Sequence, residues 1–323
     1  MPEHVIRDYC DLTGGQFCGI ITTVANAWQH TRNRSGWVGG IVEWQEDNTA
    51  YLSVVFSWDL PCAYSRAIFL ASQGYHVYAG GPAVLMNPTY LSGIVETTNL
   101  KDVIFRHNPN ATFTSRGCIR KCKFCIVPKI EGDLVELNNW PIRPIICDNN
   151  LLACSKVHFD DVVDKLKSLS GVDFNQGLDA RLLTSYHANR LAELDFRCIR
   201  LAWDHIKDEA IFRKAFQLLI DGGIPANMIR VYCLIGFDDT PEDALYRLET
   251  IRSLGALPNP MRYQPINTIQ KNSYVSPNWT NSELIRYMRY WQNLRHTSCI
   301  PFQEFCLRNE PLQIVREQLS FPI

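Results

Sequence analysis

The alternation of short apolar runs with helical stretches, from residue 111 onward, restricts the fold of this chain more than any other feature. Six apolar runs are strand candidates: ATFTS, PIRPIICD, GVDFNQ, CIRLAW, IRVYCLIGF and MRYQPI. Helical periodicity falls between them at 157–169, 184–194, 207–221 and 241–254. Strands that alternate with helices pair in parallel. We therefore expect an α/β fold whose six strands form an open parallel sheet or a partial barrel.

Polar residues follow several of these runs. In both architectures the chemistry is expected at the carboxyl ends of the strands. The residues found at those positions are Asp148-Asn149-Asn150, Asn175-Gln176, Asp204-His205 and Gly236.

The chain before residue 111 predicts a single βαβ unit. An apolar run at 51–57, a helix at 62–73 and the run HVYAGG fit this pattern. Gly80 and Gly81 then turn the chain after the second strand. A phosphate cradle is the alternative, but the third glycine of a dinucleotide fingerprint is missing. Residues 1–50 show no sustained period and predict no element.

The composition predicts a protein of the cytoplasm. No stretch approaches the roughly 18 apolar residues of a membrane span, and the first ten residues do not resemble a leader. Twelve cysteines in such a chain are better interpreted as metal ligands or buried thiols than as a disulfide framework. The net charge of -1 neither names nor excludes a polyanionic partner.

The stretch TSRGCIRKCKFCIVPKIEG places Cys118, Cys122 and Cys125 within eight residues. A zinc ribbon needs a second CxxC pair, a c-type haem needs a following histidine, and a ferredoxin run continues to a fourth cysteine and a proline. None of these is present, and a thioredoxin-like pair of Cys122 and Cys125 leaves Cys118 without a purpose. Three thiolates fit three irons of a [4Fe–4S] cluster and leave one iron open.

The spacing Cys118-x3-Cys122-x2-Cys125, with Phe124 before the last cysteine, resembles the signature of the radical S-adenosylmethionine (radical SAM) enzymes. The flanking TSRGC and IVPKIEG resemble the subgroup that contains methylthiotransferases and cobalamin-domain proteins. The resemblance covers about residues 108–268 and implies a partial (β/α)6 TIM-like barrel. It implies two cofactors, a [4Fe–4S] cluster and SAM, whose reductive cleavage gives a 5′-deoxyadenosyl radical. It also implies an electron donor such as a flavodoxin or ferredoxin.

The resemblance further implies a SAM pocket. Asp148, Asn149 and Asn150 correspond to the acceptors for the SAM amino group at the end of the second strand; polar turn caps are the alternative. Gly236, in LIGFDDTPED, corresponds to the position where the backbone approaches the adenine.

Three further residues, in NQGLDAR, follow the third strand. Gln176 and Asp179 are expected to hold the ribose, and Arg181 a carboxylate. A capping aspartate with a solvated arginine is the alternative. His205 follows the fourth strand, where a structural histidine is more common than a general acid.

The sequence also departs from these relatives. Cys10, Cys18 and Cys62 lack the spacing of the second cluster of methylthiotransferases, and the cobalamin loop DxHxxG is absent. We also expect no counterpart of their C-terminal RNA-binding domain. We expect three regions: 1–107, an α/β region with a degenerate cobalamin-binding-like (Rossmann-like) fold; 108–268, the radical SAM core; and 269–323, a helical extension.

The substrate is not specified by these motifs. The enzyme hypothesis competes with a non-enzymatic iron–sulfur protein that transfers electrons or senses redox state. For an enzyme, RNA competes with a peptide or small metabolite. A basic set around the cysteines mildly favours a polyanion, although a solvated face is its alternative. That set is Arg116, Arg120, Lys121, Lys123 and Lys129.

Overall fold

The computed structural model describes residues 32–100 and 103–308. It distinguishes two compact units, Met1–Gly39 and Gly40–Ile323, and every helix and strand named below belongs to the second. Cys10 and Cys18 lie outside the described residues. The ten cysteines within them are free thiols, as expected for a chain without a disulfide framework.

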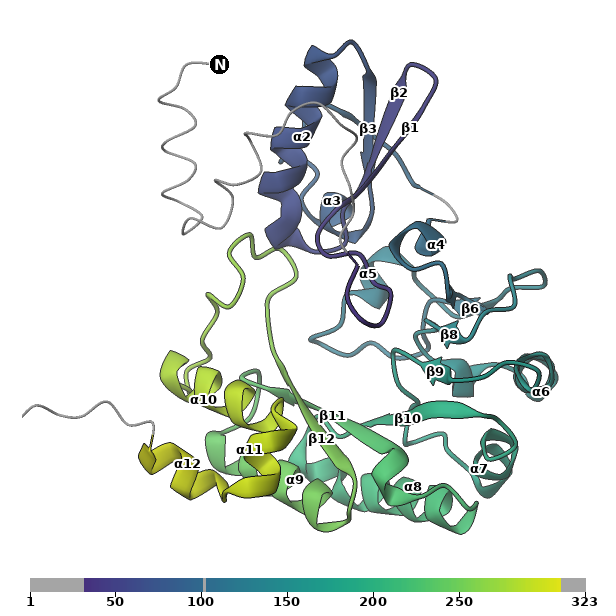
Figure 1. Cartoon of the computed structure of the whole chain (residues 1–323), viewed down its shortest axis with the longest axis vertical. Coiled ribbons are helices and arrows are strands. Elements are labelled where there is room, and N and C mark those ends of the chain that lie inside the picture. The colour runs from purple at the N-terminus through teal and green to yellow at the C-terminus, as the bar shows by residue number, and fades with distance from the viewer. Residues whose placement is uncertain (1–31, 101–102, 309–323) are drawn as a thin grey trace, which may run out of the picture. The chain divides into compact units, whose positions relative to one another are not determined.

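The larger sheet contains six parallel strands in the order β12-β11-β10-β9-β8-β5 (Figure 1). Each strand lies beside the strand of this sheet that precedes it along the chain, as short right-handed crossovers favour. The sheet is open at β5 and β12, so the α/β fold with a six-stranded parallel sheet is confirmed, whereas a closed barrel is absent from the described residues. The strands are β5 (Ala111–Thr112), β8 (Ile145–Ile146), β9 (Val172–Phe174), β10 (Phe196–Ala202), β11 (Ile229–Ile235) and β12 (Leu257–Arg262).

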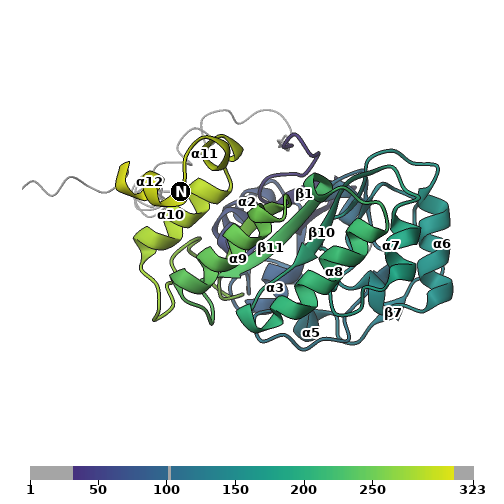
Figure 2. The ribbon, with the colours of Figure 1, turned by 90° about the horizontal axis from the view of Figure 1, so that it is seen from below.

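Helices follow the strands as predicted. Figures 1 and 2 show α6 to α9 lying along the same side of the sheet. Hydroxyl side chains cap three of these helices by accepting a backbone N–H of the first turn, as Thr240 does from Asp243 at 3.2 Å. The helices are α6 (Lys156–Leu166), α7 (Ser185–Leu191), α8 (Glu209–Asp221) and α9 (Pro241–Ser253).

Strand β12 lies earlier than the run MRYQPI predicts. The observed strand has the sequence LPNPMR, and Pro258 and Pro260 argue against a strand in a pattern-based prediction. Proline is tolerated here because β12 is an edge strand whose only neighbour is β11. The N–H groups that the prolines lack are not needed by a second neighbour.

The smaller sheet has the order β1-β2-β3-β4. Its central β2–α2–β3 unit is parallel, which confirms the predicted βαβ unit, and β1 adds an antiparallel hairpin. Gly80 and Gly81 work as a close-packed turn: a Cβ at Gly80 would lie 2.4 Å from the Thr98 carbonyl oxygen, and one at Gly81 2.5 Å from that of Val54. The elements are β1 (Val42–Glu46), β2 (Thr49–Ser53), α2 (Leu60–Ser72), β3 (His76–Gly80), α3 (Pro82–Met86) and β4 (Glu96–Thr97).

The described chain ends in helices, as predicted. A capping box between Thr280 and Glu283 starts α10, which packs against β12. No described helix has the length and apolar character needed to cross a bilayer. The remaining elements are α4 (Ile104–His107), β6 (Ser115–Arg116), α5 (Val127–Ile130), β7 (Val135–Glu136), α10 (Asn281–Trp291), α11 (Leu294–Cys299) and α12 (Phe302–Arg308).

Candidate cofactor site at the carboxyl edge of the parallel sheet

A cavity of about 300 Å³ lies where strands β8 to β11 end. Polar loops gather at this edge because the carboxyl ends of parallel strands all point to it. The cavity brings together most of the residues that the sequence singled out. Those that line it are Cys118, Cys122, Phe124, Cys125, Asn149, Asn150, Gln176, Asp179 and Arg181.

The cysteine loop is held tightly at its start. Gly117 has a φ of 74°, and a Cβ there would come within 2.0 Å of the Asp133 carbonyl oxygen, so this close approach requires glycine. The backbone N–H of Cys118 donates to the Gly132 carbonyl at 3.2 Å. The loop is therefore fixed against the segment that follows α5.

Glu131 links the cysteine loop to the end of β8. Its carboxylate accepts hydrogen bonds from the Gly117 N–H at 2.9 Å and from Asn149 Nδ2 at 2.7 Å, and it pairs with Arg116 at 2.8 Å. This role was not predictable from the sequence, because the motif KIEG alone does not show which backbone groups the Glu131 carboxylate reaches. Glu131 is a positioning residue for the loop.

The three thiols lie close enough to influence one another. Burial raises the pKa of Cys122, while the nearby Arg181 guanidinium opposes that shift and Cys118 adds to it. Burial also raises the pKa of Cys125. Two donors already point at the Cys118 sulfur: the Arg120 N–H at 3.3 Å and Asn150 Nδ2 at 3.7 Å. Such donors stabilise a thiolate once it is formed.

The donor set discriminates between the kinds of metal group that it can hold. Within residues 32–100 and 103–308, no three His, Cys, Asp or Glu side chains converge as a site for one metal ion. A four-iron cluster makes a different demand, because each thiolate binds its own iron and the sulfurs need not meet at one point. Cys118, Cys122 and Cys125 on one cavity wall fit a cluster better than a single ion.

Asp148 does not line the cavity. The side chain is 4% exposed, and its carboxylate accepts hydrogen bonds from the backbone N–H and hydroxyl of Thr114 and from the hydroxyl of Ser115. Burial raises the pKa of Asp148, and these bonds oppose the shift. Its position makes it an anchor for the chain leading into the cysteine loop, in place of the expected contact to SAM.

Asn150 carries an acceptor without a donor. Its Nδ2 donates to the Cys118 sulfur and, at 3.1 Å, to Asp179 Oδ2. Its Oδ1 is buried and has no hydrogen-bond partner in the described part of the chain, although the residue is only 2% exposed. A buried acceptor of this kind costs about 1–3 kcal/mol when it stays unpaired. Because Asn150 lines the cavity, a cavity ligand that reaches this buried atom would supply the missing donor.

Asp179 is held as a carboxylate between two arginines. Burial by itself would raise its pKa, but hydrogen bonds from Arg181 at 2.7 Å and Arg120 at 3.0 Å outweigh burial and lower it. Arg181 remains 42% exposed and faces the cavity, where it can meet an anionic group. Gln176 lines the same wall.

Gly236 serves packing at this edge. Its φ is 76°, and a Cβ would lie 2.8 Å from Leu284 Cδ2 of α10. It does not line the cavity, although the next residue, Phe237, does. The ring of Phe237 meets that of Phe124 edge to face at 5.8 Å. The backbone thus needs glycine at 236, and the aromatic wall comes from its neighbour.

Asp204 and His205 line the cavity at the end of β10, as their place after the strand predicted. Burial raises the pKa of Asp204, and its Oδ1 accepts the Leu234 N–H at 3.1 Å. A carboxyl whose pKa is raised in a cavity is typical of functional sites.

These observations define a mixed α/β protein with a thiol-lined site at the carboxyl edge of its parallel sheet. No protein-family model matches the chain, and no curated protein matches it either.

Proposed function

We propose that this protein is a radical SAM enzyme whose [4Fe–4S] cluster is held by Cys118, Cys122 and Cys125. The observation that carries the proposal is that these three cysteines line one cavity together with Asn150, whose Oδ1 is buried and unpaired. In this proposal, the six-stranded sheet is the partial (β/α)6 barrel of that superfamily. In this proposal, the iron that no cysteine binds and the Asn150 Oδ1 acceptor both bind SAM.

The cluster and SAM, when bound, supply reductive cleavage of the sulfonium and hydrogen-atom abstraction from a substrate. The protein contributes binding and orientation. Asn150 Oδ1 accepts from the SAM ammonium group, and Arg181 binds its carboxylate. Phe124 and Phe237 offer apolar ring surface for the adenine. Asp179 keeps Arg181 in place through the bond at 2.7 Å.

The exposed face of the cysteine loop suits an acidic electron donor of the flavodoxin or ferredoxin type. Lys121, Lys123 and Lys129 are exposed there, beside Ile119, which is 50% exposed. Positive charge around an apolar contact steers an acidic partner to the loop that binds the cluster. Electron donors of this type are proteins of the cytoplasm, which is the location that the proposal implies.

The test is anaerobic reconstitution followed by reduction in the presence of SAM. We expect about four irons and four sulfides per chain and the formation of 5′-deoxyadenosine and methionine. Cys118→Ala, Cys122→Ala and Cys125→Ala should each abolish both. Cys299→Ser is the matched control, because Cys299 is exposed and does not line the cavity. Stoichiometric zinc without iron would overturn the proposal, and a cluster that never binds or cleaves SAM would favour electron transfer or redox sensing.

A further inference from the structure

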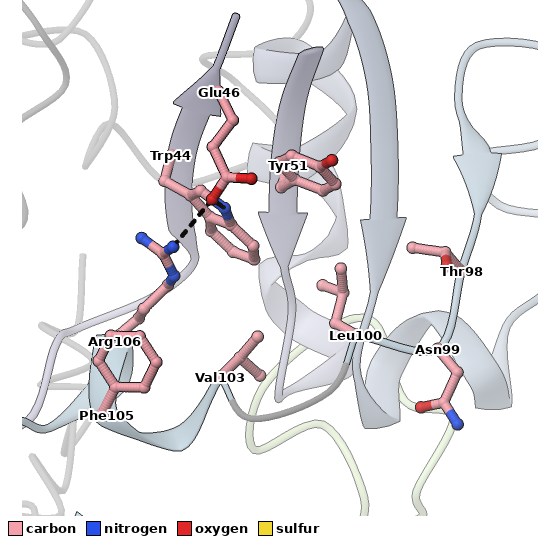
Figure 3. A pocket seen from close by; sticks show the side chains of 9 residues that line it. All are labelled: Trp44, Glu46, Tyr51, Thr98, Asn99, Leu100, Val103, Phe105 and Arg106. Atoms are coloured by element: carbon pink, nitrogen blue, oxygen red, sulfur yellow. Dashed lines mark hydrogen bonds and ion pairs between the residues drawn. The ribbon is translucent and has the colours of Figure 1, made fainter.

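A second pocket, of about 460 Å³, lies on the smaller sheet (Figure 3). Its lining residues are Trp44, Glu46, Tyr51, Thr98, Asn99, Leu100, Val103, Phe105 and Arg106. Figure 3 shows the Trp44 and Tyr51 side chains in front of the strands and a helix behind the strands. The pocket therefore occupies the sheet face opposite α2.

An aromatic row crosses this face. Trp44, Tyr51 and Tyr78 are directly paired across β1, β2 and β3. Their ring centroids are 5.0 and 5.8 Å apart, and successive planes differ by 12° and 20°. All three residues are only partly buried. The core side chains of this sheet, Leu52 and Ala79 among them, point to the other face, so the row is not needed to fill the core.

Cationic and hydrogen-bonding groups border the row. The Arg106 guanidinium lies 4.3 Å from the centre of the Trp44 ring and 3.1 Å from Glu46 Oε1. The same carboxylate oxygen accepts from Trp44 Nε1 at 3.1 Å. Phe105 is 39% exposed, and the guanidinium of Arg143 lies 5.6 Å from its ring. Planar rings, guanidinium groups and a carboxylate thus share one surface.

We propose that this surface binds single-stranded nucleic acid. Nucleobases stack on aromatic rings displayed by a sheet, and arginines contact the phosphates between them. Glu46 and Asn99 can hydrogen-bond base edges inside the pocket. Tyr78 continues the row beyond the residues that line the pocket, which gives more stacking surface than one base covers and favours a strand over a free nucleotide. Arg106 is ion-paired with Glu46, and Arg143 donates to the Ala111 carbonyl at 2.9 Å, so the two arginines exceed the Glu46 carboxylate by one charge, which favours a polyanion over a neutral sugar chain.

This inference goes beyond the proposed function, because the surface lies outside the cysteine cavity and needs no cluster.

The test is fluorescence anisotropy of the full chain with labelled single-stranded RNA of about 12 nucleotides, a length within the usual site size of such platforms. Trp44→Ala and Tyr51→Ala should each weaken binding about tenfold. Phe56→Ala is the matched control: Phe56 is 49% exposed and stacks on Trp58 at 4.6 Å, yet it does not line the pocket. Its affinity should stay within about twofold of the wild type.

Two variants separate binding from folding. Trp44→Phe keeps a ring and should bind more tightly than Trp44→Ala. Arg106→Gln should lower the slope of log affinity against log salt by about 0.7, the loss of one phosphate contact on a single strand. Circular dichroism melting verifies that each variant is folded.

Three results would overturn the proposal. The first is the absence of RNA binding at about 100 µM protein, a concentration far above the dissociation constant of a specific site. The second is an equal loss of RNA affinity in Phe56→Ala and Trp44→Ala. The third is a mononucleotide that binds as tightly as the oligonucleotide. Cys118→Ala, which lacks a cluster ligand, should bind RNA like the wild type. Failure of the cluster hypothesis and failure of this one are therefore distinguishable.

Discussion

The two pockets are built in opposite ways. In the cysteine cavity, buried and half-buried polar side chains hold one another through hydrogen bonds, as Asn150, Asp179 and Arg120 do. In the pocket on the smaller sheet, partly exposed rings of Trp44 and Tyr51 stack on a framework that other residues stabilise. In the cavity, the same residues therefore stabilise the fold and form the proposed binding site, whereas in the aromatic pocket these two tasks fall to different residues. Substitutions in the cavity should affect both stability and binding, whereas those in the aromatic pocket should affect binding with only a small loss of stability.

The two pockets differ because their backbone N–H and C=O groups are satisfied in different ways. Loops that follow parallel strands leave N–H and C=O groups outside the ladder, and side chains must satisfy them. Asp239 does so after β11 by accepting from the Gly236 N–H at 2.9 Å. On the face of the smaller sheet, the ladder already pairs the backbone groups of β1 to β3. Side chains there are available for a ligand.

The largest expected effect of a substitution is on stability, at Asp239. This carboxylate pairs with Arg247 at 2.6 Å, and the Arg247 side chain is fully buried. Asp239→Ala leaves that charge unpaired and should lower the free energy of unfolding by about 3–5 kcal/mol. Trp44→Ala should cost only about 1 kcal/mol, because the stacked ring is partly exposed. Urea unfolding measures both.

The control for Asp239→Ala is Asp238→Ala, which removes the exposed neighbouring carboxylate. Its unfolding free energy should stay within about 0.5 kcal/mol of the wild type. If Asp239→Ala were no more destabilising than Trp44→Ala, the contrast between the two pockets would not hold.

Asp59, at the start of α2, puts a largely buried carboxyl in the region of the smaller sheet. Burial raises its pKa from 3.8 to about 6, against the opposing effect of Lys271. The folded state then binds the proton more tightly than the unfolded state, so stability should fall as the pH rises from about 4 to about 6. The contribution amounts to at most about 3 kcal/mol. Thermal unfolding across this pH range should show a shallower decline in Asp59→Asn than in the wild type.

Asp47→Asn provides the comparison, since Asp47 is exposed and asparagine tolerates its positive φ of 51°. Its stability profile should follow that of the wild type. A profile of Asp59→Asn that also follows the wild type would show that Asp59 titrates normally in the fold.

Much of the larger sheet could be predicted from the sequence, because periodicity and capping are local properties. Thr240 and Pro241 start α9 where the pattern indicated. Strand β12 could not be placed, since the tolerance for Pro258 and Pro260 depends on its being an edge strand. That property belongs to the whole sheet.

The cysteine cavity shows the same division between features that the local sequence predicts and features that depend on the whole fold. The spacing of Cys118, Cys122 and Cys125 is local and was sufficient to select them, and all three line the cavity. The roles of Asp148 and Asn150 were not predictable, because the chain leaves regular strand geometry after β8; Asn150 has a ψ of 74°. Alternation of side chains no longer indicates which residue faces the cavity. Likewise, the aromatic row required the register of β1 to β3, which no short motif encodes.

The smallest expected effect is on SAM affinity, and it shows whether Asn150 or Asp148 contacts SAM. Asn150→Ala removes the unpaired Oδ1 and should weaken SAM binding to reconstituted protein about tenfold, equivalent to about 1.4 kcal/mol. Asp148→Asn disturbs the bonds from Thr114 and Ser115, so it should lower stability by about 1–3 kcal/mol but leave SAM affinity within about twofold. Anaerobic equilibrium dialysis, at matched iron content, measures both affinities. A tenfold loss in Asp148→Asn with unchanged affinity in Asn150→Ala would restore Asp148 as the SAM contact, because it would require the strand end to rearrange when the ligand binds.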